Sequence, residues 1–223
     1  MSDCPFFCKL KFSLLFLIIF CVSFFLFSCE NSEPEVLSVT SSVVLDFENE
    51  TSFAKPRLCV FVETASDARR VEFISVTCRK NNYTWIDTAP EVIGSNSQQW
   101  AGSSNLVAAN DENIPFGLYD LKYSDSEGRE VQTVFSVLDT ESYTKVVSSK
   151  IKSLLPEGFN EKIALYDSSN VLLYYGEKKD SWKSDKEVFT LNSKTEYYRI
   201  CYEAFSGGIV CLLPPVYKEN FSN

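Results

Sequence analysis

The residue whose surroundings most clearly predict chemistry is Cys29, which directly follows a long apolar run. The seventeen residues 12–28 contain no charge, no Gly and no Pro, and Lys9 and Lys11 precede them. A basic start, an apolar middle and a small residue before a cut are typical of a secretory signal. The predicted cut lies between Ser28 and Cys29, so the mature chain begins with a cysteine.

The junction Leu26-Phe27-Ser28-Cys29 resembles the lipobox of bacterial lipoproteins, with a Leu three residues before the cysteine and a small residue just before it. The bulky Phe27 is more similar to the relaxed lipoboxes of spirochaetes than to the enteric pattern. The resemblance implies that the thiol of Cys29 receives a diacylglyceryl group and that the new amino terminus can then be acylated, for example with palmitate. Two or three acyl chains would anchor the chain firmly, whereas one binds a membrane only marginally.

Two other interpretations of the leader remain open. As a helix, the apolar run is roughly 25 Å long at about 1.5 Å per residue, shorter than the ~20 residues that comfortably span a bilayer, so one alternative is a signal anchor. The other is a cleaved signal without a lipid. In all three cases the charge asymmetry across the run exports the rest of the chain. The predicted location is the bacterial cell envelope outside the cytoplasm, on the periplasmic face of the inner membrane or on the outer membrane.

The charge of the mature chain excludes some partners. Residues 29–223 carry 19 basic and 29 acidic side chains, because the leader holds only Lys9, Lys11 and Asp3. A formal charge of −10 repels phosphate backbones and anionic headgroups. We therefore expect no nucleic-acid partner, and membrane attachment through the acyl chains on Cys29 alone.

The chain contains no histidine. This excludes a serine or cysteine nucleophile activated by imidazole and every metal site that needs a histidine ligand. A chain without histidine can still use paired carboxylates, a lysine-activated serine or a metal bound by oxygen ligands, but no motif for any of these sites is recognisable. The sequence therefore predicts no enzyme, no cofactor and no metal.

Four cysteines remain besides Cys29 and those of the leader: Cys59, Cys78, Cys201 and Cys211. An exported protein can keep disulfides, and four cysteines allow three pairings. A hairpin with the loop 205–207 would set Cys201 opposite Cys211, and a hairpin with the loop 67–70 would do the same for Cys59 and Cys78. A two-residue loop at 207–208 would instead set Cys211 opposite Ala204. Four reduced, buried thiols are the alternative.

Runs rich in β-branched and aromatic residues predict strands in the first half of the mature chain, at 36–45, 57–63, 71–79 and 83–86. Residues 114–138 predict a hairpin, with Tyr119, Leu121 and Tyr123 on one face and a turn at 125–128. This order resembles the closing strands of bacterial immunoglobulin-like and fibronectin-III-like sandwiches. Tyr119 occupies the position of the corner tyrosine, whereas Leu121 replaces the second bridging cysteine of antibody domains. The resemblance covers about residues 36–139 and implies a β-sandwich.

The second half predicts one helix and further strands. Apolar residues recur at helical spacing after the polar break at 139–142 and end at Pro156 and Gly158. Strands are expected at 162–166, 171–175, 188–191, 197–201 and 209–213, with Asn170 left-handed in the first turn. The predicted fold is mainly β, with a signal peptide at 1–28, a tether at 29–35, a sandwich at 36–139 and a smaller β-rich domain with one helix at 140–223.

Aromatic residues supply the candidate ligand contacts. The stretch 88–113 has a weak strand signal only at 105–109, so we expect a long irregular loop. Such loops often bind ligands, and the candidate contacts in this one are Trp100 and the acidic pair 111–112. The alternative places Trp100 over one end of the core. Adjacent tyrosines put one ring of each pair on a second face, where Tyr175, Tyr198 and Trp182 would form a platform for sugars or apolar peptides. The alternative is packing beneath the helix or against the first domain.

The most direct functional interpretation is a lipid-anchored binding or structural module with a protein or glycan ligand. Fold-level analogy supports the class of protein better than any ligand. Two alternatives come from other classes: a hydrolase that acts on envelope polymers through paired carboxylates, and a subunit of an envelope assembly. A cleft with two carboxyl groups about 5–10 Å apart would favour the hydrolase.

Overall fold

The computed structural model describes residues 33–221, apart from residues 66, 96–97 and 110–111. Residues 34–223 form one compact unit. The predicted signal at 1–28, the cleavage and lipidation residues Ser28 and Cys29, and most of the tether lie outside the described residues. So does Asp111 of the predicted binding loop.

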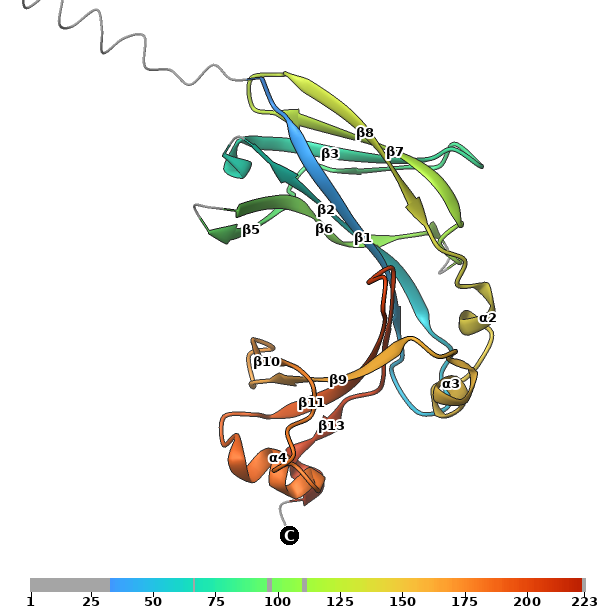
Figure 1. Ribbon diagram of the computed structural model, residues 1–223, viewed down its shortest axis with the longest axis vertical. Coiled ribbons are helices and arrows are strands. Elements are labelled where there is room, and N and C mark those ends of the chain that lie inside the picture. Colours follow the sequence, from blue (N-terminus) through green and yellow to red (C-terminus); the bar gives the residue numbers. More distant parts are fainter. Residues whose placement is uncertain (1–32, 66, 96–97, 110–111, 222–223) are drawn as a thin grey trace, which may run out of the picture. The chain divides into compact units, whose positions relative to one another are not determined.

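The described chain is mainly β, as the sequence predicts, and its strands form two sheets (Figure 1). The larger sheet has the order β10-β9-β11-β12-β1-β2-β6-β5, and β13 pairs with β11 beside this path. Its strands are β1 (Val36–Asp46), β2 (Lys55–Thr64), β5 (Glu91–Ser95), β6 (Gln98–Val107), β9 (Phe159–Tyr166), β10 (Leu172–Gly176), β11 (Tyr197–Ala204), β12 (Ile209–Leu212) and β13 (Val216–Tyr217). The smaller sheet has the order β4-β3-β7-β8 and consists of β3 (Val71–Cys78), β4 (Thr84–Asp87), β7 (Gly117–Asp125) and β8 (Glu130–Val137).

Strand periodicity explains why the two sheets pack face to face. Successive side chains of a strand point to opposite faces, so alternate apolar residues form one buried side. On β2, Leu58, Val60 and Val62 are fully buried, and on β7 Tyr119 and Tyr123 are fully buried as well. These residues of the two sheets belong to one hydrophobic core, with β3, β7 and β8 facing β1, β2 and β6 (Figure 1).

The predicted hairpin at 114–138 is confirmed. β7 and β8 pair antiparallel in one continuous register that sets Tyr119 opposite Phe135. The turn between them uses Gly128 at φ +76°, in the left-handed region that favours glycine. Asn170 has φ +62° in the β9–β10 turn, as predicted.

The strands of the second half continue the sheet of the first half. β12 pairs parallel with β1 over Val43–Asp46, and β11 pairs with both β12 and β9. The main core also includes Ile151, Tyr202 and Ile209. Strands on both sides of the boundary predicted at residue 139 therefore share a sheet and a core.

The helices differ from the prediction. The single helix expected after residue 142 is two short ones, α2 (Glu141–Thr144) and α3 (Ser148–Leu154). An antiparallel bridge between Phe53 and Val147 separates them, because Val147 is extended and Ser148 N donates to Ser52 O.

Two more expectations about the elements were wrong. Residues 188–191 were expected to form a strand, but they belong to α4 (Asp185–Leu191), which begins after a capping box between Ser184 and Glu187. The stretch 88–113 holds the whole of β5 and β6 in place of an irregular loop. Gly102 is one reason why a strand was not expected in this stretch, because glycine is uncommon inside strands. Here β6 lies so close to β2 that a Cβ at position 102 would be 2.1 Å from Val60 O.

Candidate functional site

The four aromatic residues predicted as ligand contacts do not form one surface. Trp182 and Tyr198 are 3% and 4% exposed and pack in a small core with α4, where Tyr198 Oη donates to Asp185 Oδ1 at 2.7 Å. Tyr175 is 44% exposed and donates to Glu203. Trp100 lies half-buried on β6. Only Tyr175 and Trp100 are therefore accessible, and they stand on strands at different ends of the sheet.

The four cysteines after Cys29 are free thiols. Cys201 is opposite Leu212 and Cys211 is opposite Tyr202, so the predicted register is wrong by one residue and the two thiols point to opposite faces. Cys59 and Cys78 lie on strands of different sheets, so their predicted hairpin does not form. Burial raises the pKa of Cys201 and of Cys211 to about 12, which makes both thiols poor nucleophiles.

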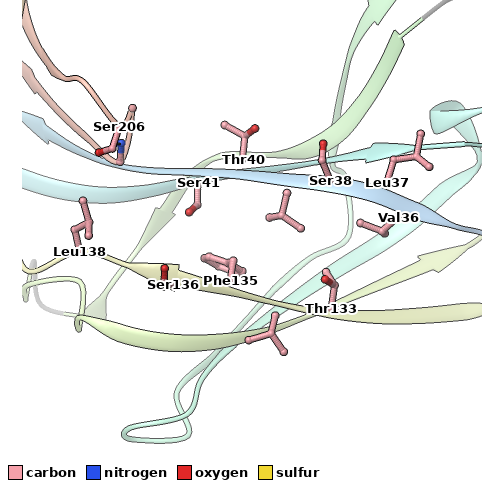
Figure 2. Close-up of a pocket in the computed structure, with 14 residues that line it drawn as sticks. Val36, Leu37, Ser38, Thr40, Ser41, Thr133, Phe135, Ser136, Leu138 and Ser206 are labelled. Atoms are coloured by element: carbon pink, nitrogen blue, oxygen red, sulfur yellow. Dashed lines mark hydrogen bonds between the residues drawn. The ribbon is translucent and has the colours of Figure 1, made fainter.

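The candidate site is a groove between β1 and β8, with a volume of about 550 Å³ (Figure 2). Its walls come from the amino-terminal half of β1 and the carboxyl-terminal half of β8, and the β11–β12 turn adds a third side. The lining side chains are apolar or hydroxyl-bearing, with two glycines: Val36, Leu37, Ser38, Val39, Thr40, Ser41, Thr133, Val134, Phe135, Ser136, Leu138, Ser206, Gly207 and Gly208. In Figure 2, Ser41 and Phe135 lie in the space between the two strands.

Both strands that line the groove have an unpaired edge there. β8 ends the four-stranded sheet and pairs only with β7. β12 pairs with β1 only from Val43 onward, so the earlier part of β1 pairs only with β2. An unpaired strand edge presents free N–H and C=O groups, which makes it a template for another extended chain.

The β11–β12 turn closes one end of the groove. Ser42 Oγ donates to Gly207 O, and Val43 N donates to Gly208 O at 3.0 Å. Gly207 has φ +72°, in the left-handed region that favours glycine. A Cβ on Gly208 would be 2.9 Å from Leu138 Cδ1, which shows how closely the turn meets the end of β8.

The groove is suited to binding and carries no group for acid–base chemistry. None of its lining residues is charged. Apolar side chains are exposed along its rim, with Leu37 at 55%, Val134 at 46% and Leu138 at 43%. Exposed apolar side chains gathered at one place mark surfaces that a partner covers.

A second, smaller hollow of about 290 Å³ lies beside a row of three tyrosines on β9, β11 and β13. Tyr166 stacks on Tyr197 at 4.9 Å, and Tyr217 lies 5.6 Å from Tyr197. Asp167 and Glu196 both line this hollow. However, Asp167 Oδ1 accepts hydrogen bonds from two backbone N–H groups of its own turn, so the role of this carboxylate is to stabilise the turn.

The strands that line the groove were predictable from the sequence, but the groove itself was not. Periodicity shows which residues face a core, but it does not show which strand ends a sheet. One signal was present. Of the outward positions of β8, only Glu130 at its start is charged, and Gln132, Val134 and Ser136 are not, although edge strands are usually protected by charged residues or Pro.

No cluster of potential metal-ligating side chains and no helix long and apolar enough to cross a membrane occurs within the described parts of the chain. In the comparisons with known proteins, no family model, no curated protein and no solved structure matches this chain.

Proposed function

We propose that this chain is an exported, lipid-anchored protein of the bacterial envelope whose immunoglobulin-like β-sandwich acts as a binding module. In this proposal Cys29 carries the acyl chains, and the groove between β1 and β8 holds the ligand. The observation that carries the binding role is the groove itself, where two unpaired strand edges and exposed apolar side chains occur together.

The immunoglobulin-like assignment is supported by the surroundings of Tyr119. Its hydroxyl donates to the carbonyl of Pro115, four residues upstream, at 2.5 Å, which is the arrangement of a tyrosine corner. Tyr119 is fully buried and stacks on Phe135 of the neighbouring strand. Leu121 is buried where antibody domains place a cysteine, so the proposal concerns the sandwich architecture and not the antibody-type subfamily.

The hydrolase alternative has less support from the described residues. The groove lacks carboxylates, and the hollow beside the three tyrosines, which has two of them, uses Asp167 in its own turn. A glycosidase needs two carboxyl groups that are free to exchange protons across a cleft. A binding role is therefore the proposal that fits the larger site.

Intact-mass analysis of the detergent-extracted full-length product tests the anchor. We expect a chain that begins at Cys29 and carries added acyl mass. Cys29→Ala should abolish both processing and acylation, whereas Cys21→Ala, a matched change within the leader, should leave the product unchanged. A product that begins at Met1 without acyl mass would contradict the proposed function.

A further inference from the structure

We propose that the ligand of the groove is an extended, uncharged segment of a partner polypeptide, which joins the free edge of β8 as an additional strand. This inference rests on the proposed function, because it names the class of ligand for the same groove. Main-chain hydrogen bonds would supply the affinity, and the side chains of the groove would select the segment.

The hydrogen-bond pattern shows which groups of β8 are free. Asp125 N donates to Arg129 O, and Arg79 N donates to Leu118 O, so the odd-numbered residues of β7 face β8. The register then directs the backbone groups of the odd-numbered residues of β8 toward β7. The N–H and C=O groups of the even-numbered residues Gln132, Val134 and Ser136 therefore point away from β7, toward the open edge.

The free backbone groups of β1 can be identified in the same way. Val43 N and Phe47 N donate to carbonyls of the Gly208–Leu212 segment, which sets the direction of every second residue along β1. By this alternation the backbone groups of Val39 and Ser41 face the same side, beyond the end of β12. In Figure 2 the numbering rises in the same direction along both strands, so one inserted strand can be antiparallel to β1 and β8 at once.

β8 is also the longest edge strand among the described residues. The other strands that end a sheet are β4 with four residues, β5 with five and β10 with five, whereas β8 has eight. Short edges protect a sheet from additional strands. The combination of a long edge with a second open edge across a groove makes β8 the place where a strand would gain the most hydrogen bonds.

The groove also indicates what kind of segment fits. Its lining is uncharged, so a charged side chain that entered would lose hydration without gaining an ion pair. The tether of this chain is a poor candidate, because residues 30–35 carry three glutamates and Pro34, which lacks an N–H. β1 stands opposite β8, so a partner must enter as a single strand and not as the edge of a second sheet.

A displayed library of ten-residue peptides, selected on the detergent-solubilised full-length protein, tests this inference. We expect the enriched peptides to have an uncharged alternating core. Val134→Pro removes an outward N–H without touching the β7–β8 ladder and should weaken binding at least tenfold, which is about 1.4 kcal/mol. Val134→Thr keeps the N–H and the branched shape and should change binding less than twofold. Both variants should keep the circular dichroism spectrum of the parent protein.

A second measurement uses the unchanged protein. Methylating the backbone nitrogens of an enriched peptide one at a time should weaken binding most at alternate positions, whose N–H groups face β8. The effect should be smaller at the positions between them, which face β1, where Val39 and Ser41 alone present backbone groups beyond the end of β12. The inference is overturned if no peptide is enriched, if Val134→Pro binds as tightly as the parent, or if the methylation effect shows no period of two. A parent dimer that Val134→Pro dissociates would also overturn it, because a second copy would then cover the edge. None of these results depends on acylation of Cys29, so the proposed lipid anchor and the proposed peptide ligand can be disproved independently of each other.

Discussion

Asp125 holds the β7–β8 turn together, close to the strand that carries the proposed site. It is 2% exposed and accepts hydrogen bonds from Glu127 N, Arg129 N and Arg129 Nε, all at 3.0 Å. Burial raises the pKa of Asp125, but the hydrogen bonds from Arg129 and Glu127 outweigh burial and leave the pKa below its usual value. The ionised form is therefore the one that the fold stabilises.

Asp125→Asn should lower the free energy of unfolding by about 2–3 kcal/mol, because it removes an acceptor of charged hydrogen bonds. Since the pKa of Asp125 is lowered by folding, its contribution is present above about pH 4 and is lost as the pH falls through the folded pKa. Urea denaturation at several pH values measures both effects. Asp120→Asn is the matched control: its ion pair with Arg79 is exposed and screened by solvent, so it should destabilise the protein much less than Asp125→Asn. Equal effects of the two changes would contradict this account of the turn.

The cysteines give a second test at the residue scale. Cys78, Cys201 and Cys211 are buried and Cys59 is only half-buried. In the native protein we expect iodoacetamide to label Cys59 first and to leave Cys201 and Cys211 unmodified, which mass spectrometry can read site by site. After unfolding without a reductant, all four should be labelled. Sites that become reactive only after reduction would show disulfides that this structure does not contain.

At the scale of elements, α4 depends on its capping box. Ser184 N donates to Glu187 Oε2 at 2.8 Å, and Glu187 N donates to Ser184 Oγ at 3.4 Å. Ser184→Ala should lower the free energy of unfolding by about 1 kcal/mol. Ser181→Ala, at an exposed position just before the helix, is the control and should have almost no effect. If the two variants had the same denaturant midpoint, the cap would contribute nothing to the stability of the protein.

The same elements show how far sequence reasoning reaches. β2 and β7 were predictable because their buried residues alternate, and the β7–β8 turn was predictable from its Gly and Asp residues. α4 was missed although Ser184 and Glu187 have capping-box spacing, because a short apolar run fits a strand equally well. The groove was beyond prediction from periodicity, because it depends on which strands become neighbours. That order is set by tertiary packing, through the parallel pairing of β1 with β12.

At the scale of the whole molecule, the parallel pairing of β1 with β12 joins the two halves of the chain. Core residues from beyond residue 139, such as Ile151 and Ile209, pack with residues of β2 and β7. We therefore expect one cooperative unfolding transition in calorimetry. A chain that ends at residue 139 should fail to fold, because the buried residues of β1 would lose their cover. Two separate transitions, or a stable fragment, would show two independent domains.

The open edge of β8 is the feature on which the proposed binding role depends, and amide hydrogen exchange measures it directly. In the free protein we expect an alternating pattern, with slow exchange at Val131, Thr133 and Phe135 and fast exchange at Gln132 and Val134. A bound peptide should slow the fast amides. Uniform slow exchange along β8 in the free, monomeric protein would show that the edge is already covered, and it would contradict the proposed site.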